Sequence, residues 1–183
     1  MNKNIEVEIR GLLTDEKYNQ IINFLDKEGQ NKELDDRKTT FFIMPEKTLK
    51  ITEKISQNKA KISLKTGDIV LDNSQTEFEI EIDPSEFAIA ENIFIKLGFN
   101  QIQHTEQKRI NYDYEEVEFA IKWSVDWGYH FEMEKMVSNE SEVGEARETL
   151  HKLATKLDLE VMSEEEFGRR CKEIDNKYNP KQD

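Results

Sequence analysis

Several segments of this chain alternate between charged and apolar residues, and this alternation constrains the fold more than any other feature. Residues 5–10 read Ile-Glu-Val-Glu-Ile-Arg, and residues 75–82 carry the same pattern with three glutamates. Side chains two apart in a strand share a face, so each segment predicts a strand with one charged and one apolar face. Similar segments lie near 36–44, 48–56, 59–66, 107–114, 116–123 and 129–137. The sequence therefore predicts eight strands, and the short connections between them favour antiparallel pairing.

Four helices are predicted from capping residues and from apolar residues at helical spacing. The first runs from about Asp15 to Glu28, with Thr14 as its N-cap and Gly29 after its end. The second begins with an N-cap Asp83 followed by a proline and a glutamate, in the order of a capping box. The expected ranges of the second, third and fourth helices are about 83–98, 142–157 and 163–178.

The bulk properties are those of one globular domain. The chain has 183 residues, which suits a single core, and we expect that core to cover residues 4–158. A formal net charge of −13 argues against a nucleic-acid polymer or an anionic membrane as partner. No apolar run reaches the length of a membrane helix, and Cys171 is the single cysteine, so a cytoplasmic protein is expected. The composition leaves a monomer and a homodimer equally open.

The signs of the charges are sorted by predicted strand. Acidic strands carry Glu6 and Glu8, Glu77 and Glu79, and Glu132 and Glu134, whereas the basic strands carry Lys50 and Lys54, and Lys61 and Lys65. For any one strand, a solvated sheet face is the simpler explanation. Like charges at neighbouring positions repel, however, so the sorted set favours a bound partner. Divalent cations would neutralise the carboxylates, and a polyanion such as a triphosphate would neutralise the ammonium groups.

A closed antiparallel barrel of eight strands is the predicted architecture. A barrel of this size has room inside for side chains or for one small ligand. Turning the charged faces inward gives a polar interior, and the four amphipathic helices then cover the apolar faces outside. The predicted class is accordingly α+β.

The order of motifs resembles that of the CYTH proteins, the triphosphate tunnel metalloenzymes. Glu6-Val-Glu8-Ile-Arg10 is similar to their ExExK signature near the N-terminus. Five further pieces follow in family order across residues 5–135: Leu49-Lys50-Ile51, the strand from Lys61 to Gly67, Glu77-Phe78-Glu79, Leu97 to Tyr112, and the strand from Gly128 to Glu134. Each piece is weak alone, and the six in sequence are specific.

The resemblance implies cleavage of a triphosphate compound with Mg²⁺ or Mn²⁺ inside a closed tunnel. Family members include inorganic triphosphatases, thiamine-triphosphatases, RNA triphosphatases and class IV adenylate cyclases. Metal ligands would come from Glu6, Glu8, Glu77, Glu79, Glu132 and Glu134, and Glu6, Glu8 and Arg10 would form the catalytic signature. The phosphate-binding groups would be Arg10, Lys50, Lys54, Lys61, Lys65, Arg109 and Lys122.

Four positions depart from the family pattern. Arg10 replaces the lysine of the signature, Gln75 stands where a basic residue is common, and Thr52 replaces a frequent arginine. Lys122 stands where the family usually has an aspartate, which exchanges an implied metal ligand for a cation. Glu118 and Asp126 are nearby carboxylates that could compensate.

Three functions are compatible with these motifs. A triphosphatase acting on inorganic triphosphate, thiamine triphosphate or a nucleoside triphosphate is preferred, because no nucleoside-selecting motif is visible. A class IV adenylate cyclase would use the same groups on ATP, and a non-catalytic polyphosphate or nucleotide binder would retain only the binding groups. His130 shares a face with the site candidates, and a hydrogen-bonding role is expected for it rather than metal ligation.

Overall fold

The computed structural model describes residues 5–44, 47–66 and 76–178, and contacts within the chain group its residues into two compact units. Unit 1 comprises residues 1–34 and 108–163, and unit 2 comprises residues 35–107 and 164–183. Strand β7 (Ile102–Tyr114) contributes residues to both units. Gly67 and Gln75, which entered the comparison with the family motifs, lie outside the described residues.

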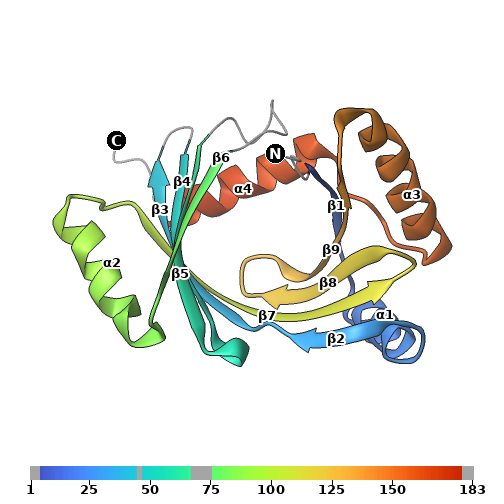
Figure 1. Ribbon diagram of the computed structural model, residues 1–183, viewed down its shortest axis with the longest axis horizontal. Helices are drawn as coiled ribbons and strands as arrows, with labels where there is room; N and C mark the ends of the chain where they lie inside the picture. The colour runs from blue at the N-terminus through green and yellow to red at the C-terminus, as the bar shows by residue number, and fades with distance from the viewer. Residues whose placement is uncertain (1–4, 45–46, 67–75, 179–183) are drawn as a thin grey trace. The chain divides into compact units, whose positions relative to one another are not determined.

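Unit 1 is an antiparallel sheet covered by two helices. Its strands are β1 (Ile5–Leu12), β2 (Gln30–Leu34), β8 (Val117–Ser124), β9 (Gly128–Val137) and the C-terminal part of β7. Strand β9 pairs with β1 on one side and β8 on the other, and β2 pairs with β7. The helices are α1 (Asp15–Glu28) and α3 (Val143–Lys156), and Figure 1 shows α3 beside β1 and β9.

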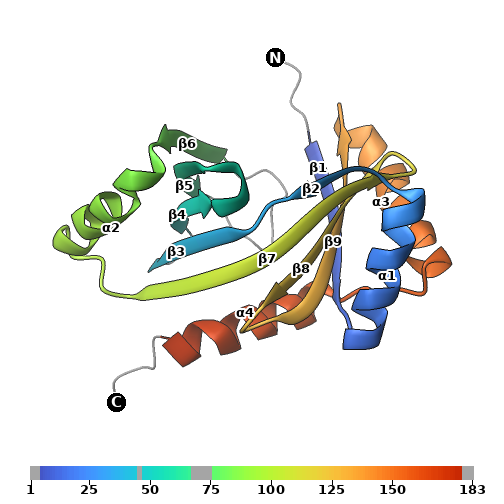
Figure 2. The ribbon, with the colours of Figure 1, turned by 90° about the horizontal axis from the view of Figure 1, so that it is seen from below.

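The core of unit 1 lies between this sheet and its helices. Alternate residues of β1, β8 and β9 are buried together with Ile21 and Leu25 of α1 and Leu150 and Leu153 of α3. Figure 2 shows α1 and α3 on the same side of β1 and β9. Burial of one sheet face at about 25 cal/mol per Å² of apolar surface stabilises this arrangement and leaves the alternate, charged positions on the other face.

The described residues of unit 2 form four complete strands and two α-helices. The strands β3 (Arg37–Met44), β4 (Lys47–Lys54), β5 (Lys59–Thr66) and β6 (Thr76–Ile82) form antiparallel neighbours in chain order. Helix α2 (Phe87–Lys96) packs its buried Phe87 and Ala90 on Phe42, Leu49 and Ile51 of the sheet. Helix α4 (Glu164–Tyr178) is the last described element.

The capping box predicted at Asp83 is present. The Asp83 carboxylate accepts hydrogen bonds from Ser85, and the Glu86 side chain accepts one from the backbone N–H of Asp83. The turn that follows is a 3-10 helix, Pro84–Glu86, before α2 begins. All four predicted helices are observed, and their bounds differ from the predicted ones by only a few residues.

The predicted α+β class and antiparallel pairing are confirmed, but the prediction of a closed eight-stranded barrel is not. The described residues form nine strands, paired along the path β1-β9-β8-β7-β3-β4-β5-β6, with β2 joined to β7 beside this path. Within the described part of the chain, β1 and β6 end the path and do not pair with each other. The ninth strand, β2, was missed because all five of its residues are exposed, so its sequence shows no alternation.

Strand β7 is also longer than predicted. It begins at Ile102 rather than near residue 107, because its first half pairs with β3 from Ile102 to Gln107. No helix among the described residues is long and apolar enough to cross a membrane.

Candidate functional site

The charged face of unit 1 is assembled by the register of β1, β9 and β8. Glu134 of β9 lies opposite Glu8 of β1 and opposite Glu118 of β8. Two residues away on the same face of β9, Glu132 lies opposite Arg10. The intervening positions of these strands belong to the apolar core, so the alternation predicted from sequence is realised.

Two buried cations lie on this face. Arg109 of β7 and Lys122 of β8 are 7% and 4% exposed. The Lys122 ammonium forms an ion pair with Glu132, and Arg109 Nη1 lies 3.7 Å from the same carboxylate oxygen, Oε2. Arg109 Nη2 also lies 3.7 Å from Oε1 of Glu118. Buried charges are tolerated when they are paired in this way, so both cations are held in place by the carboxylates around them.

A neighbouring amide fixes the orientation of the Arg109 side chain. Its Nε donates a 2.6 Å hydrogen bond to Asn111 Oδ1, two residues along β7 on the same face. Asn111 was not singled out from the sequence, although its spacing from Arg109 was a usable signal.

The N-terminal signature lies together on β1. Arg10 Nη2 is 3.1 Å from Glu8 Oε1, and both side chains are about one-fifth exposed. Glu6, on the same face of the strand, is exposed. The three residues predicted as a catalytic signature are therefore neighbours, and Glu8 and Arg10 form an ion pair.

Glu134 is electrostatically different from its neighbour Glu132. Burial, together with the negative charges of Glu6, Glu118 and Glu8, raises the pKa of Glu134 to about 7, and Arg109 opposes this shift. Among the described residues, no cation lies within 4 Å of the Glu134 carboxylate. A cation bound near Glu134 would relieve this repulsion.

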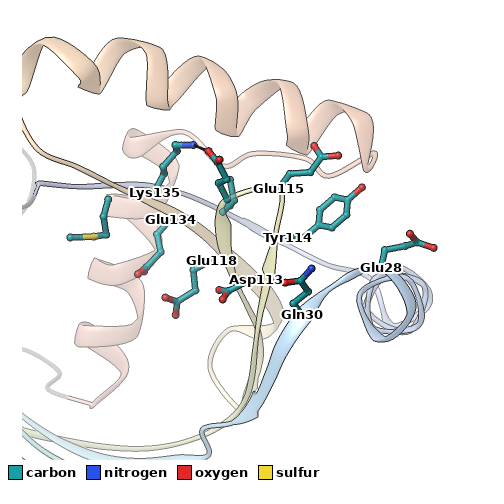
Figure 3. Close-up of a pocket in the computed structure, with 11 residues that line it drawn as sticks. Glu28, Gln30, Asp113, Tyr114, Glu115, Glu118, Glu134 and Lys135 are labelled. Atoms are coloured by element: carbon teal, nitrogen blue, oxygen red, sulfur yellow. Dashed lines mark hydrogen bonds and ion pairs between the residues drawn. The ribbon is translucent and has the colours of Figure 1, made fainter.

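An open cavity of about 810 Å³ adjoins this carboxylate. In Figure 3 the side chains of Glu134, Glu118 and Asp113 lie close to one another at this cavity, and Lys135 pairs with Glu116 at 3.2 Å. The remaining lining residues are Glu28, Gln30, Tyr114, Glu115, Val117 and Met136. The lining is strongly acidic, which favours cations over anions at this position.

His130 has the hydrogen-bonding role expected for it. Its Nδ1 donates to the carbonyl oxygen of Gly128 at 2.9 Å, and its ring lies 6.0 Å from that of Trp127. The side chain is buried and lies opposite Lys122 in the register of β8 and β9.

The polar face of unit 2 carries the basic residues predicted to bind phosphate. Lys50 of β4 lies opposite Ser63 of β5, and Lys61 forms an ion pair with Glu79 of β6. Buried hydroxyls lie among these cations, and Thr39 and Thr52 are 3.3 Å apart through their Oγ1 atoms. Ammonium and hydroxyl groups on one face are the donors that phosphate oxygens require.

Lys54 is held by a residue that sequence reasoning missed. Asp35 is fully buried and accepts a hydrogen bond from Arg37, and its carboxylate lies 3.7 Å from Lys54 Nζ. The spacing of Asp35 and Arg37, two residues apart at the start of a strand, was the available signal.

The predicted site residues thus fall into two groups. Unit 1 brings together Glu6, Glu8, Arg10, Arg109, Lys122, Glu132 and Glu134. Unit 2 brings together Lys50, Lys54, Lys61 and Glu79. The backbones of Lys65 and Glu77 are opposite each other in β5 and β6, but their side chains lie outside the described residues. Glu118 is added to the group in unit 1 by its contact with Arg109.

The donor chemistry around Glu134 fits a divalent cation of the Mg²⁺ or Mn²⁺ type. Within the described residues, no three acidic, histidine or cysteine side chains are gathered closely enough to form a ready metal site. Mg²⁺ does not require such a cage, because it is usually bound by one or two carboxylates with waters and substrate phosphates. Glu134, with the negative charges of Glu8 and Glu118 beside it, meets this weaker requirement.

The fold and these charged faces define an antiparallel α+β protein with sorted acidic and basic groups on its strands. The CYTH domain family model matches residues 4–167, so the chain belongs to the CYTH domain family. No curated protein matches the chain.

Solved structures with similar folds come from several organisms. A conserved hypothetical protein from Pyrococcus furiosus is 25% identical, with a TM-score of 0.66 over 86% of this chain and 94% of that one. A candidate adenylate cyclase from Vibrio parahaemolyticus is 16% identical, with a TM-score of 0.64 over 87% and 93%. A candidate adenylyl cyclase from Hippeastrum, described as having a dominant triphosphatase activity, is 14% identical, with a TM-score of 0.61 over 87% and 90%. At these identities, the last two establish similarity of fold.

Proposed function

We propose that this protein hydrolyses a small triphosphate compound in a reaction that depends on Mg²⁺ or Mn²⁺. The observation that carries the proposal is the charged face of unit 1, where two buried cations, Arg109 and Lys122, lie among the carboxylates of Glu118, Glu132 and Glu134. Membership of the CYTH family supports the same reaction class. Inorganic triphosphate, thiamine triphosphate and a nucleoside triphosphate are the candidate substrates.

In this proposal the cationic side chains bind and orient the phosphate chain. Arg109 is oriented by Asn111 and Glu118, so its guanidinium requires little rearrangement to meet phosphate oxygens. Arg10, held at 3.1 Å by Glu8, is a further phosphate ligand. Within unit 2, Lys50, Lys54 and Lys61 are further candidate phosphate-binding groups. Fixed cations of this kind stabilise the charge of a transferring phosphoryl group.

In this proposal the carboxylates bind the metal ion and activate the attacking water. Glu8 and Glu134, with Glu6 and Glu118 beside them, would hold the divalent ion. When bound, the ion neutralises phosphate charge and makes the terminal phosphorus more electrophilic. Glu6 or Glu8 would orient the attacking water and accept its proton.

A substrate panel tests the proposal. The protein is incubated with tripolyphosphate, thiamine triphosphate and ATP, each with Mg²⁺ or Mn²⁺, and released phosphate and cyclic AMP are measured. We expect phosphate release from at least one substrate that stops when the metal is chelated. Cyclic AMP and pyrophosphate from ATP would instead identify a cyclase.

Two matched variants connect the activity to the site. Glu8→Gln should lower turnover at least 100-fold, the order expected for loss of a group acting in the transition state, with little change in stability. Glu148→Gln changes an exposed glutamate of α3 that pairs with Lys152 and should leave turnover unchanged. Full activity of Glu8→Gln would contradict the assignment of the site.

A non-catalytic binder is the second candidate, and the Lys122–Glu132 ion pair favours it. This pair uses one of the implied metal-ligand carboxylates for an internal cation. Tripolyphosphate would then raise the melting temperature of the protein, while no phosphate would be released with any metal. That combination of results would select the binder over the hydrolase.

A further inference from the structure

The Lys122–Glu132 pair contains a buried lysine. Lys122 is 4% exposed and its ammonium contacts Glu132 Oε2. A buried ammonium is retained in a fold when a carboxylate compensates its charge, so this contact is a fixed part of the site rather than a mobile surface pair.

A second cation approaches the same oxygen. Arg109 Nη1 lies 3.7 Å from Glu132 Oε2, and Arg109 is itself 7% exposed. Glu132 therefore faces two positive side chains that cannot easily move into solvent. A divalent ion placed on this carboxylate would be repelled by both, and the repulsion is strong because neither is well screened by water.

Glu134, two residues further along the same strand face, has the opposite surroundings. Its carboxylate faces Glu8 and Glu118 across the strand pairs, and no described cation lies within 4 Å of it. It also lines the open cavity, with Glu118 beside it in Figure 3, so a hydrated ion has access to it. On this face, β9 thus presents Glu132, which is paired with cations, and Glu134, which has no described cation within 4 Å.

We propose that Lys122 is the permanent counter-ion of Glu132, so that only Glu134 and the carboxylates facing it bind divalent metal. Lys122 therefore determines how many divalent ions the site binds. Glu132 forms an ion pair with Lys122 and is not a metal ligand. The inference rests on the proposed function for the presence of a metal and goes beyond it in assigning the ligands.

Direct measurement of Mn²⁺ binding tests the inference without substrate or turnover. Isothermal titration and the electron paramagnetic resonance signal of free Mn²⁺ give the affinity and the number of ions bound. We expect Glu134→Gln to weaken Mn²⁺ binding at least 10-fold, and Glu132→Gln to change the affinity by less than 3-fold. Lys122→Gln frees the Glu132 carboxylate and should tighten Mn²⁺ binding or add a second ion.

A double variant covers the case in which Lys122→Gln fails to fold. Lys122→Met with Glu132→Met replaces the pair by uncharged side chains of similar size, an exchange that buried ion pairs often tolerate. It should bind Mn²⁺ within 3-fold of the unmodified protein. A 10-fold loss in this variant, or equal losses in Glu132→Gln and Glu134→Gln, overturns the inference.

Failure of the inference can be told apart from failure of the proposed function. Equal losses in the two glutamate variants, with phosphate still released by the unmodified protein, overturn only the ligand assignment. Absence of phosphate release with every metal, while Mn²⁺ binds as described, overturns only the hydrolase. An unmodified protein that binds no Mn²⁺ and releases no phosphate with any metal overturns both.

Discussion

Glu132 and Glu134 share a strand, a face and a side-chain type, yet their surroundings give them opposite electrostatic properties. Glu132 is compensated by Lys122 and approached by Arg109, whereas Glu134 faces other carboxylates. The difference arises from which residues of the neighbouring strands lie near each glutamate and not from β9 itself. Residue-scale chemistry at this site is therefore set by side chains of the neighbouring strands.

The raised pKa of Glu134 predicts a pH dependence of stability. Its folded value of about 7 exceeds the ordinary 4.5, so between these values the folded state holds a proton that the unfolded state has lost. The contribution of Glu134 to stability is therefore present at low pH and is lost as pH rises through about 7. Without metal, the difference in unfolding free energy between the protein and Glu134→Gln should change by roughly 1 kcal/mol between about pH 5 and pH 8, discounted for partial exposure.

Chemical denaturation at several pH values in the presence of a chelator measures this difference. The protein should lose stability relative to Glu134→Gln as pH rises. A difference that stays constant with pH, or that changes in the other direction, would contradict the pKa assignment. Glu148→Gln is the control: this residue is exposed, so the stability difference between this variant and the protein should not change with pH.

Asp35 predicts a second effect at the residue scale. Its carboxylate is fully buried between Arg37 and Lys54, so Asp35→Asn leaves two cations without their common partner. We expect a loss of about 2 to 4 kcal/mol in the free energy of unfolding, measured by urea denaturation. Asp158→Asn is the matched control, because its pair with Lys17 is at the surface and should contribute less than about 1 kcal/mol. Similar losses in both variants would mean that burial does not distinguish the two carboxylates.

At the scale of elements, Gly11 shows how closely β1 packs. A Cβ atom at this position would collide with the carbonyl oxygen of Glu160 and lie 2.6 Å from the ring of Phe131. Backbone atoms cannot move aside easily, so only glycine fits between β1, its partner strand and the chain after α3.

Gly11→Ala should therefore destabilise the protein by about 1 to 3 kcal/mol, the range found for overpacked cores. Gly144→Ala is the comparison, since a Cβ there meets nothing within 4 Å and the residue lies in α3. Alanine favours helix over glycine by up to about 1 kcal/mol, so this variant should be neutral or more stable. Thermal unfolding of both variants measures the contrast, and a stable Gly11→Ala protein would be incompatible with the observed packing.

For the whole molecule, net charge is the property with a measurable consequence. A formal charge of −13 produces long-range repulsion, whereas the exposed ion pairs each contribute little. Added salt screens the repulsion within a Debye length of about 8 Å at physiological ionic strength. We expect the melting temperature to rise by a few degrees between about 10 mM and about 200 mM NaCl at neutral pH. A falling melting temperature would show that local ion pairs outweigh the net charge.

The sequence by itself determined the elements that depend on local patterns. Eight strands with one charged and one apolar face were predicted from alternation, and helices from caps and spacing, because these signals lie within a few residues of each other. The order of motifs also predicted the family that the comparison with known families confirmed. Arg10, Glu8 and Glu6 could be grouped because residues two apart in one strand share a face.

Only the tertiary structure decided which charges meet across strands. The contact of Lys122 with Glu132, the absence of any described cation within 4 Å of Glu134 and the burial of Asp35 depend on register and packing between different strands. Strand β2 and the early start of β7 were likewise beyond the sequence, since backbone pairing with β7 and β3 requires no side-chain pattern. Alternation is a property of one strand, whereas compensation of a buried charge is a property of its neighbours.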